Sequence, residues 1–358
     1  METISVELAA RSYPIWIEDG LLKKLPQLLT DADGAKVVVI TQPALTTRYG
    51  RKLVADLNQS RFSAMLIEVP AGEKAKTLEQ VEGLYRQLLE LRCDRATLLL
   101  ALGGGTVGDL TGFVAATFLR GIAYLQVPTT LLAMVDSAIG GKTGVNLPQG
   151  KNLVGTIYQP RAVAVDPTVL ATLPPRELVS GLAEVLKYGA IADREFFDLL
   201  SANLPLLLAG RDGELLTRVI RRSAAIKAAV IAEDEHENDR RRILNFGHTI
   251  GHALEKLAGY GYLTHGEAVA FGMVAAGFIS NRRGLLSTDG WRSLETTIRR
   301  LPLPVLSQQD PNQVHETLRH DKKVRAGKLH FVLLQRLGQA VIVDDISDRE
   351  ISAALEVL

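Results

Sequence analysis

Cysteine and net charge are the scarcest features of this 358-residue sequence. Cys93 is its only cysteine, so no disulfide can form within the chain. The 41 Lys and Arg residues nearly balance 40 Asp and Glu residues, which leaves a formal net charge of +1. A chain this balanced generates no long-range field that would favour nucleic acid or an anionic membrane as a partner.

Long hydrophobic runs are also missing. The longest apolar stretch, residues 268–279, is shorter than the roughly 20 residues that a membrane-spanning helix needs. The opening Met-Glu-Thr-Ile-Ser-Val-Glu does not combine a basic region with an apolar core, as signal peptides do. We therefore expect a soluble cytoplasmic protein, and its length favours two domains.

The first half of the sequence alternates short apolar runs with amphipathic segments. Lys-Val-Val-Val-Ile-Thr at 36–41 is typical of a buried parallel strand. The alternation predicts an α/β domain over residues 1–173, with a Rossmann-like dinucleotide-binding sheet covered by helices on both faces. We expect strands at 4–8, 13–17, 36–41, 65–69, 97–102, 124–127 and 162–166, and helices at 21–29, 46–57 and 77–91.

A glycine-rich turn follows the strand expected at 97–102. Gly103, Gly105 and Gly108 satisfy Gly-x-Gly-x-x-Gly between a strand and a helix, as a dinucleotide site requires. Glycines let the backbone approach a pyrophosphate, and amides at the helix start attract its charge. No acidic residue closes the next strand about 20 residues on, so an ordinary strand-to-helix turn remains an alternative.

A second glycine-rich segment, Gly-Gly-Lys-Thr at 140–143, is a partial P-loop. Asp136 stands where the first glycine of that motif belongs, and no strand directly precedes the segment, so we reject a nucleotide triphosphatase. Lys142, Lys151 and Asn152 lie in Gly- and Pro-rich stretches expected to be loops. They are either anion-binding groups or ordinary solvated loop residues.

The second half reads as mainly helical. Prolines at 167, 174 and 175 mark a boundary, after which we expect a helical metal-binding domain over residues 174–358. Its expected elements are helices at 177–188, 215–232, 288–300, 311–320 and 351–358, and a hairpin formed by 329–335 and 339–343.

Three of the seven histidines fall near two expected helix starts. His248 and His252 are four apart and share a helix face, and His265 directly precedes the next helix. Imidazoles with one carboxylate would suit zinc and leave a position open for substrate. Glu184, which shares a face with Lys187 in an apolar helix, is the best candidate for that carboxylate. The alternatives are packed or capping histidines and a surface ion pair.

Taken together, these motifs resemble the 3-dehydroquinate synthases of the sugar-phosphate cyclase superfamily. The resemblance implies a shikimate-pathway enzyme that uses catalytic NAD and a divalent metal, zinc or cobalt. It would convert 3-deoxy-D-arabino-heptulosonate 7-phosphate into 3-dehydroquinate and phosphate by transient oxidation, phosphate elimination, re-reduction, ring opening and aldol closure. The matching segments are 70–76, 103–116, 127–137, 140–144, 150–155, 183–189, 245–273 and 321–323.

Position by position, the resemblance implies that Glu184, His248 and His265 bind the metal, in place of a His248/His252 pair. His252 would then lie near the phosphate, in reach for proton transfer. Arg241 would bind the substrate carboxylate. The other groups implied to hold phosphate, substrate or its ring hydroxyls are Arg120, Asp136, Lys142, Asn152, Lys187, Lys227, Asn245, and Lys322 or Lys323.

The resemblance also implies an NAD site and a functional homodimer. Arg120 would reach into the site of a neighbouring subunit. Gln42 stands where the family often has Asp or Asn near the adenosine. The residues implied to contact NAD are Glu73, Lys76, Gly104, Gly105, Thr106, Val107, Gly108, Asp109, Thr129, Thr130, Lys142, Lys151, Val169, Leu170, Ala171 and Thr172.

Three other readings compete with this one. Related cyclases act on sedoheptulose 7-phosphate or glucose 6-phosphate, which lack the carboxylate that Arg241 would bind. A metal- and NAD-dependent alcohol or glycerol dehydrogenase would have little use for so many cations. A metal-stabilised binding module would normally need four protein ligands rather than three. We expect a small sugar phosphate as substrate, with neither nucleic acid nor membrane as a partner.

Overall fold

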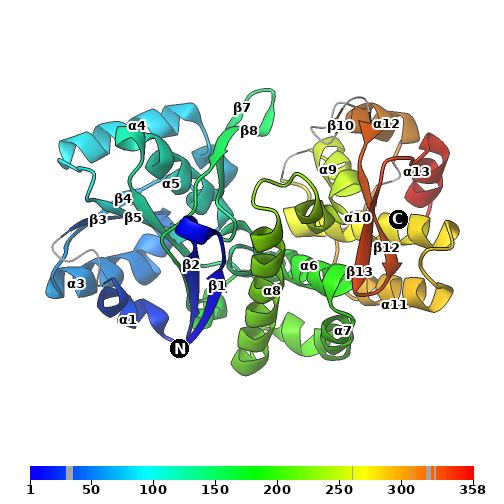
Figure 1. Cartoon of the computed structure of the whole chain (residues 1–358), viewed down its shortest axis with the longest axis horizontal. Coiled ribbons are helices and arrows are strands. Elements are labelled where there is room, and N and C mark those ends of the chain that lie inside the picture. The colour runs from blue at the N-terminus through cyan, green and yellow to red at the C-terminus, as the bar shows by residue number, and fades with distance from the viewer. Residues whose placement is uncertain (30–34, 260, 308, 320–323, 326–327) are drawn as a thin grey trace. The chain divides into compact units, whose positions relative to one another are not determined.

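The computed structural model (Figure 1) describes residues 1–29, 35–259, 261–307, 309–319, 324–325 and 328–358. Lys322 and Lys323, expected near the substrate, lie outside the described residues. Contacts group the chain into two compact units: unit 1 is Met1–Leu173 with Lys227–Glu235, and unit 2 is Pro174–Ile226 with His236–Leu358. Lys227–Glu235 therefore groups with unit 1, although we had placed it in the second domain. It does so because Lys227 binds Asp136 and Glu235 binds Arg11.

Unit 1 is built on a seven-stranded sheet of order β1-β2-β9-β6-β5-β3-β4. Its first two strands pair antiparallel, and the other pairings are parallel. This confirms the predicted α/β class. The strands are β1 (Glu2–Val6), β2 (Tyr13–Ile17), β3 (Lys36–Thr41), β4 (Ser63–Glu68), β5 (Leu98–Gly103), β6 (Ala123–Pro128) and β9 (Val163–Val165).

Each face of this sheet has its own apolar core. Along β3, Val38 faces a core shared with α4 (Leu78–Glu90) and α5 (Gly105–Thr117). Val37 and Val39 face the opposite core, shared with α1 (Leu21–Leu28) and α3 (Arg51–Gln59). Alternate residues of a strand point to opposite faces, so a strand covered on both sides must be apolar throughout. The uninterrupted run in β3 follows from this. A short helix α2 (Pro43–Leu45) leads towards α3.

A long hairpin, β7 (Lys142–Leu147) and β8 (Gly150–Ile157), occupies the stretch that we expected to be loops. Lys142, Lys151 and Asn152 are therefore strand residues, and the loop assignment was wrong. Gly144 and Gly155 are paired across the hairpin, and a Cβ at Gly155 would lie 2.2 Å from the backbone oxygen of Thr143. These glycines permit close strand pairing here rather than marking turns. Figure 1 shows the hairpin above the sheet of its unit.

Unit 2 is mostly helical, as predicted. Its central helix is α10 (His265–Arg282), which packs against α6, α9, α11, α13 and β12. Sequence reasoning missed one helix, α7 (Arg194–Ala209). The other elements are α6 (Pro175–Ala192), α8 (Gly213–Glu233, shared with unit 1), α9 (His248–Leu257), α11 (Thr288–Arg299), α12 (Pro311–Arg319), α13 (Asp348–Leu355), the two-residue strands β10 (Val324–Arg325) and β11 (Lys328–Leu329), and the hairpin β12 (Phe331–Arg336) with β13 (Gln339–Val343).

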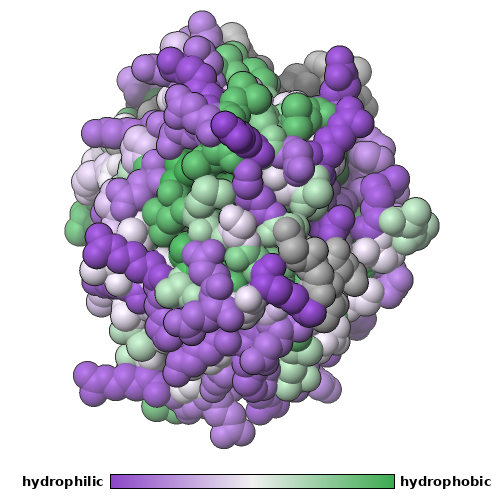
Figure 2. All heavy atoms as spheres, turned by 90° about the vertical axis from the view of Figure 1, so that its left-hand side faces the viewer, coloured by the Kyte–Doolittle hydropathy of each residue, from purple (hydrophilic) through white to green (hydrophobic). Residues whose placement is uncertain are grey.

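Apolar side chains are limited in extent, both along the described helices and on the face seen in Figure 2. No helix among the described residues combines the length and apolar character that a bilayer crossing requires. The face in Figure 2 is predominantly hydrophilic, with a smaller region of apolar side chains. Apolar side chains on this scale are normal on a protein surface.

Candidate active site

Three histidines of unit 2 converge at the starts of two helices. His248 and His252 lie one turn apart on α9, and His265 is the first residue of α10. The ring centroids are 5.1 Å apart for His248 and His265, 5.4 Å for His248 and His252, and 5.7 Å for His252 and His265. One nitrogen from each ring lies within 4.8 Å of the others, a spacing that suits a shared metal ion.

Glu184, on α6, faces two of these rings. Its Oε1 lies 3.6 Å from Nε2 of His248 and 3.4 Å from Nε2 of His265, and its other oxygen pairs with Lys187. Both members of that pair are buried, with side chains 0% and 1% exposed, so the surface ion pair is ruled out. A buried carboxylate requires compensating cations. An oxygen and two imidazole nitrogens converging in this way fit a divalent metal.

Glycines allow the three helices to approach closely enough to form this cluster. A Cβ at Gly266, next to His265, would lie 2.0 Å from the backbone oxygen of Ser180 on α6. A Cβ at Gly272 would lie 1.8 Å from the backbone oxygen of Gly247, just before α9. Sequence reasoning missed these contacts, because only the packed structure shows which helical glycines face another backbone.

The electrostatics of the cluster favour a cation. Burial lowers the pKa of His265, but the nearby carboxylates of Glu184 and Glu255 outweigh this effect and raise the value to about 9. Glu255, on α9, is buried and lies 3.9 Å from Nδ1 of His265. Glu255 is not among the predicted site residues.

Two further predicted residues of unit 2 lie in the turn before α9. Arg241 and Asn245 belong to the 3₁₀ turn Arg240–Asn245, and Arg241 is only 2% exposed. This burial rules out a solvated loop for Arg241. The side-chain amide of Asn245 donates to Oε1 of Glu237 at 2.7 Å. Glu237 was not predicted, and its positive φ of 57° marks a backbone held in an unusual conformation.

The glycine loop of unit 1 lies where a parallel sheet normally binds nucleotides. From β3 the chain first adds β4 on one side and then β5 on the other, so the strand order reverses between β3 and β5. Ligands of such sheets bind at the carboxyl ends of the strands that flank this reversal. Gly104 caps α5 there, and a Cβ at Gly105 would lie 2.7 Å from Oγ of Ser137. Gln42 follows the end of β3, at the start of α2.

Several predicted NAD contacts meet beside this loop. The buried Lys76 donates to Oδ2 of Asp109 at 2.6 Å and also to the side-chain oxygen of Asn152. Burial raises the pKa of Asp109, and the charge of Lys76 opposes that rise. Thr106 donates to Glu73 at 3.4 Å. Asn146 donates to Glu73 and accepts from the backbone amide of Asn152, which joins these residues into one polar network within unit 1.

The remaining predicted groups of unit 1 lie on helices, at turns and at strand ends. Lys227 donates to Oδ1 and the backbone oxygen of Asp136, at 2.5 and 2.7 Å. The hydroxyl of Thr130 accepts from the amide of Ala133. Arg120 is exposed in a turn where its φ is +68°. Thr129 is buried at the end of β6, and Val169, Leu170, Ala171 and Thr172 form the 3₁₀ turn Pro167–Thr172.

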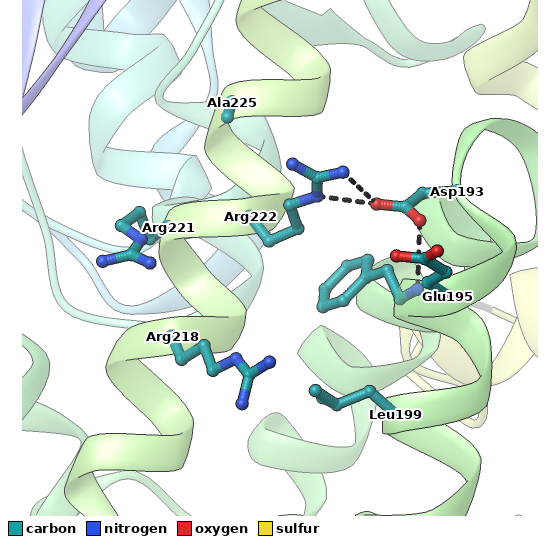
Figure 3. A pocket seen from close by; sticks show the side chains of 8 residues that line it. Asp193, Glu195, Leu199, Arg218, Arg221, Arg222 and Ala225 are labelled. Atoms are coloured by element: carbon teal, nitrogen blue, oxygen red, sulfur yellow. Dashed lines mark hydrogen bonds and ion pairs between the residues drawn. The ribbon is translucent and has the colours of Figure 1, made fainter.

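A pocket of about 370 Å³ lies between α7 and α8 in unit 2, and it contains none of the predicted site residues. Figure 3 shows Arg222 reaching across it to Asp193, with a 2.6 Å contact. Arg218 and Phe196 also line it. Because the histidines and Glu184 lie elsewhere, the chemistry points to their cluster rather than to this pocket.

The chain matches family models over much of its length. Residues 66–180 match the N-terminal model of 3-dehydroquinate synthase, and residues 181–324 match its C-terminal model. A 3-dehydroquinate synthase of Synechococcus sp. is 46% identical, over 99% of this chain and 98% of the relative. That of Desulforamulus reducens is 44% identical over 99% of both chains.

Solved structures of other enzymes share the fold of this chain. A 2-epi-5-epi-valiolone synthase from Streptomyces hygroscopicus, solved with NAD⁺ and Zn²⁺, has a TM-score of 0.90 and 33% identity over 98% of both chains. A 2-deoxy-scyllo-inosose synthase, complexed with carbaglucose-6-phosphate, NAD⁺ and Co²⁺, has a TM-score of 0.90 and 28% identity over 99% of both chains. A glycerol dehydrogenase from Schizosaccharomyces pombe, 16% identical, shares the fold with a TM-score of 0.69. Because it is 46% identical to a 3-dehydroquinate synthase over 99% of its length and matches both models of that family, this chain belongs to the 3-dehydroquinate synthase family.

Proposed function

We propose that this chain is a 3-dehydroquinate synthase, which converts 3-deoxy-D-arabino-heptulosonate 7-phosphate into 3-dehydroquinate and phosphate. The observation that carries this proposal is the buried oxygen of Glu184 between Nε2 of His248 and Nε2 of His265. It occurs in a chain that is 46% identical to a synthase over nearly its whole length.

The chain has residues that fit both cofactors of the reaction. When bound, NAD⁺ would take up and return a hydride at carbon 5, and zinc or cobalt would polarise the oxygen there. Glu184, His248 and His265 would hold the metal. The glycine loop, its neighbours Glu73, Lys76, Thr129, Thr130 and Lys151, and the turn Val169 to Thr172 would hold NAD. Solved relatives with NAD⁺ and Zn²⁺ or Co²⁺ support both assignments.

Cationic and polar side chains would hold the substrate. The guanidinium of Arg241 would pair with the carboxylate, for which its planar donors are suited. Lys142, Asn152 and Asn245 would bind phosphate oxygens. The ring hydroxyls would be held by Lys187 and by Lys227, whose ammonium is already oriented by Asp136. His252, one turn from His248, would transfer a proton near the phosphate.

We further propose a cytoplasmic homodimer in which Arg120 reaches the site of a neighbouring subunit. The exposed side chain of Arg120 and its left-handed backbone support this, since strained conformations cluster at functional sites.

Substrate discrimination tests the proposal. Phosphate release would be compared for 3-deoxy-D-arabino-heptulosonate 7-phosphate, sedoheptulose 7-phosphate and glucose 6-phosphate. We expect turnover of the first alone, and Arg241→Met should reduce kcat/KM by about 10²-fold because a buried charged pair is lost. Arg240→Met, at the exposed neighbouring arginine, is the control and should keep wild-type kcat/KM. Preferred turnover of sedoheptulose 7-phosphate would overturn the proposal and the role of Arg241 together.

A further inference from the structure

The ring nitrogens of His248 and His265 that face away from Glu184 also have defined neighbours. Nδ1 of His248 lies 3.2 Å from the backbone oxygen of Phe246. A carbonyl oxygen only accepts, so Nδ1 carries the proton and donates it. The lone pair of this imidazole is therefore on Nε2, the nitrogen that faces Glu184.

The ring of His265 lies between two carboxylates, and its Nδ1 is within ion-pair distance of Glu255. Its Nε2 lies 3.4 Å from Glu184 and its Nδ1 lies 3.9 Å from Oε2 of Glu255. The side chain of Glu255 is only 11% exposed. Because His248, His252 and Glu255 are spaced by four and three residues on α9, they lie on one face of that helix.

We infer that Glu255 is a positioning residue of the metal site, which orients the His265 ring and keeps the Nδ1 proton in place so that Nε2 faces the metal. This inference rests on the proposed function, because it assumes that His265 is a ligand. Carboxylates that accept from the second nitrogen of a ligating histidine fix its tautomer and raise its basicity. Their removal weakens metal binding by about 10–100-fold.

The test measures zinc affinity rather than turnover. Wild type, Glu255→Gln and Glu255→Leu would compete for zinc with a chromophoric chelator. Gln can still accept from Nδ1 but carries no charge, so we expect about tenfold weaker binding, and about 100-fold for Leu. Imidazole ¹⁵N spectra of the zinc-loaded proteins should show a hydrogen-bonded Nδ1–H on His265 in wild type that is lost in the Leu variant.

A matched control separates this effect from loss of helix packing. Glu267 lies on the first turn of α10, is 1% exposed and pairs with Arg176 at 2.7 Å. Glu267→Gln removes a buried charge just two residues from His265 but should leave zinc affinity unchanged. A cooperative thermal unfolding transition in each metal-free variant establishes that the variant is folded. If the Leu variant does not fold, the zinc affinity of the Gln variant alone tests the inference.

Three results would overturn the inference: wild-type zinc affinity in Glu255→Gln, equal weakening by Glu267→Gln, or no zinc binding by wild type. The first two leave the proposed function intact. Conversely, weakened zinc binding in a protein that does not act on the proposed substrate would keep this inference and reject the function.

Discussion

Gly266→Ala should disrupt the metal site through the backbone alone. The new Cβ would lie 2.0 Å from the backbone oxygen of Ser180. That separation must open by about 1.4 Å to reach ordinary van der Waals contact. Gly266 adjoins His265, and Ser180 lies one turn before Glu184 on α6. The movement would therefore separate two proposed ligands by more than the roughly 0.5 Å that a functional site tolerates.

We expect zinc affinity to fall by about 100-fold, comparable with the loss of a supporting residue. Overpacking should also cost about 1–3 kcal/mol of stability. Chelator competition and thermal unfolding measure these two effects. Gly83→Ala is the control, because a Cβ there meets nothing within 4 Å inside α4. It should leave zinc binding unchanged and stabilise the helix by about 0.5–1 kcal/mol. Wild-type zinc affinity in Gly266→Ala would refute the reasoning.

Two other predictions concern charges. Hydrogen bonds from Arg283 lower the pKa of Glu350 from 4.5 to about 2, so this pair stabilises the protein above about pH 4.5 and the stabilisation is lost as pH falls towards 2. Glu350→Gln should lower the free energy of unfolding by about 1–3 kcal/mol at pH 7, measured with denaturant, and by much less near pH 2. An equal loss at both pH values would contradict this prediction. Lys76→Met removes the cation that opposes the burial-induced rise in the pKa of Asp109. We therefore expect about tenfold weaker NAD binding, measured by calorimetry. Unchanged NAD affinity would exclude Lys76 from the cofactor site.

Elements with strong periodicity were predictable from the sequence. The strand at 36–41 was predicted to the residue, because a strand buried on both faces leaves an unbroken apolar run. The β7–β8 hairpin was not predicted, since Gly144 and Gly155 read as loop signals. Only their cross-strand pairing shows that they permit close contact. Local sequence cannot distinguish these two uses of glycine.

The candidate site was predictable to a similar extent. Glu184 could be identified because an acidic residue in an apolar helix requires a partner, and the structure places it against two of the three histidines. Glu237 and Glu255 were missed, because each sits in a segment whose polar residues suit a solvated surface equally well. The burial of Glu255 depends on contacts between helices that a single sequence does not reveal.

The most direct test of the central claim is the number of phosphate molecules released for each NAD. The protein would be given 3-deoxy-D-arabino-heptulosonate 7-phosphate and sub-stoichiometric NAD, with and without a metal chelator. We predict many phosphates per NAD without accumulation of NADH, and loss of release when the chelator removes the metal. NADH that accumulates one-for-one with product would show a dehydrogenase and would contradict the account.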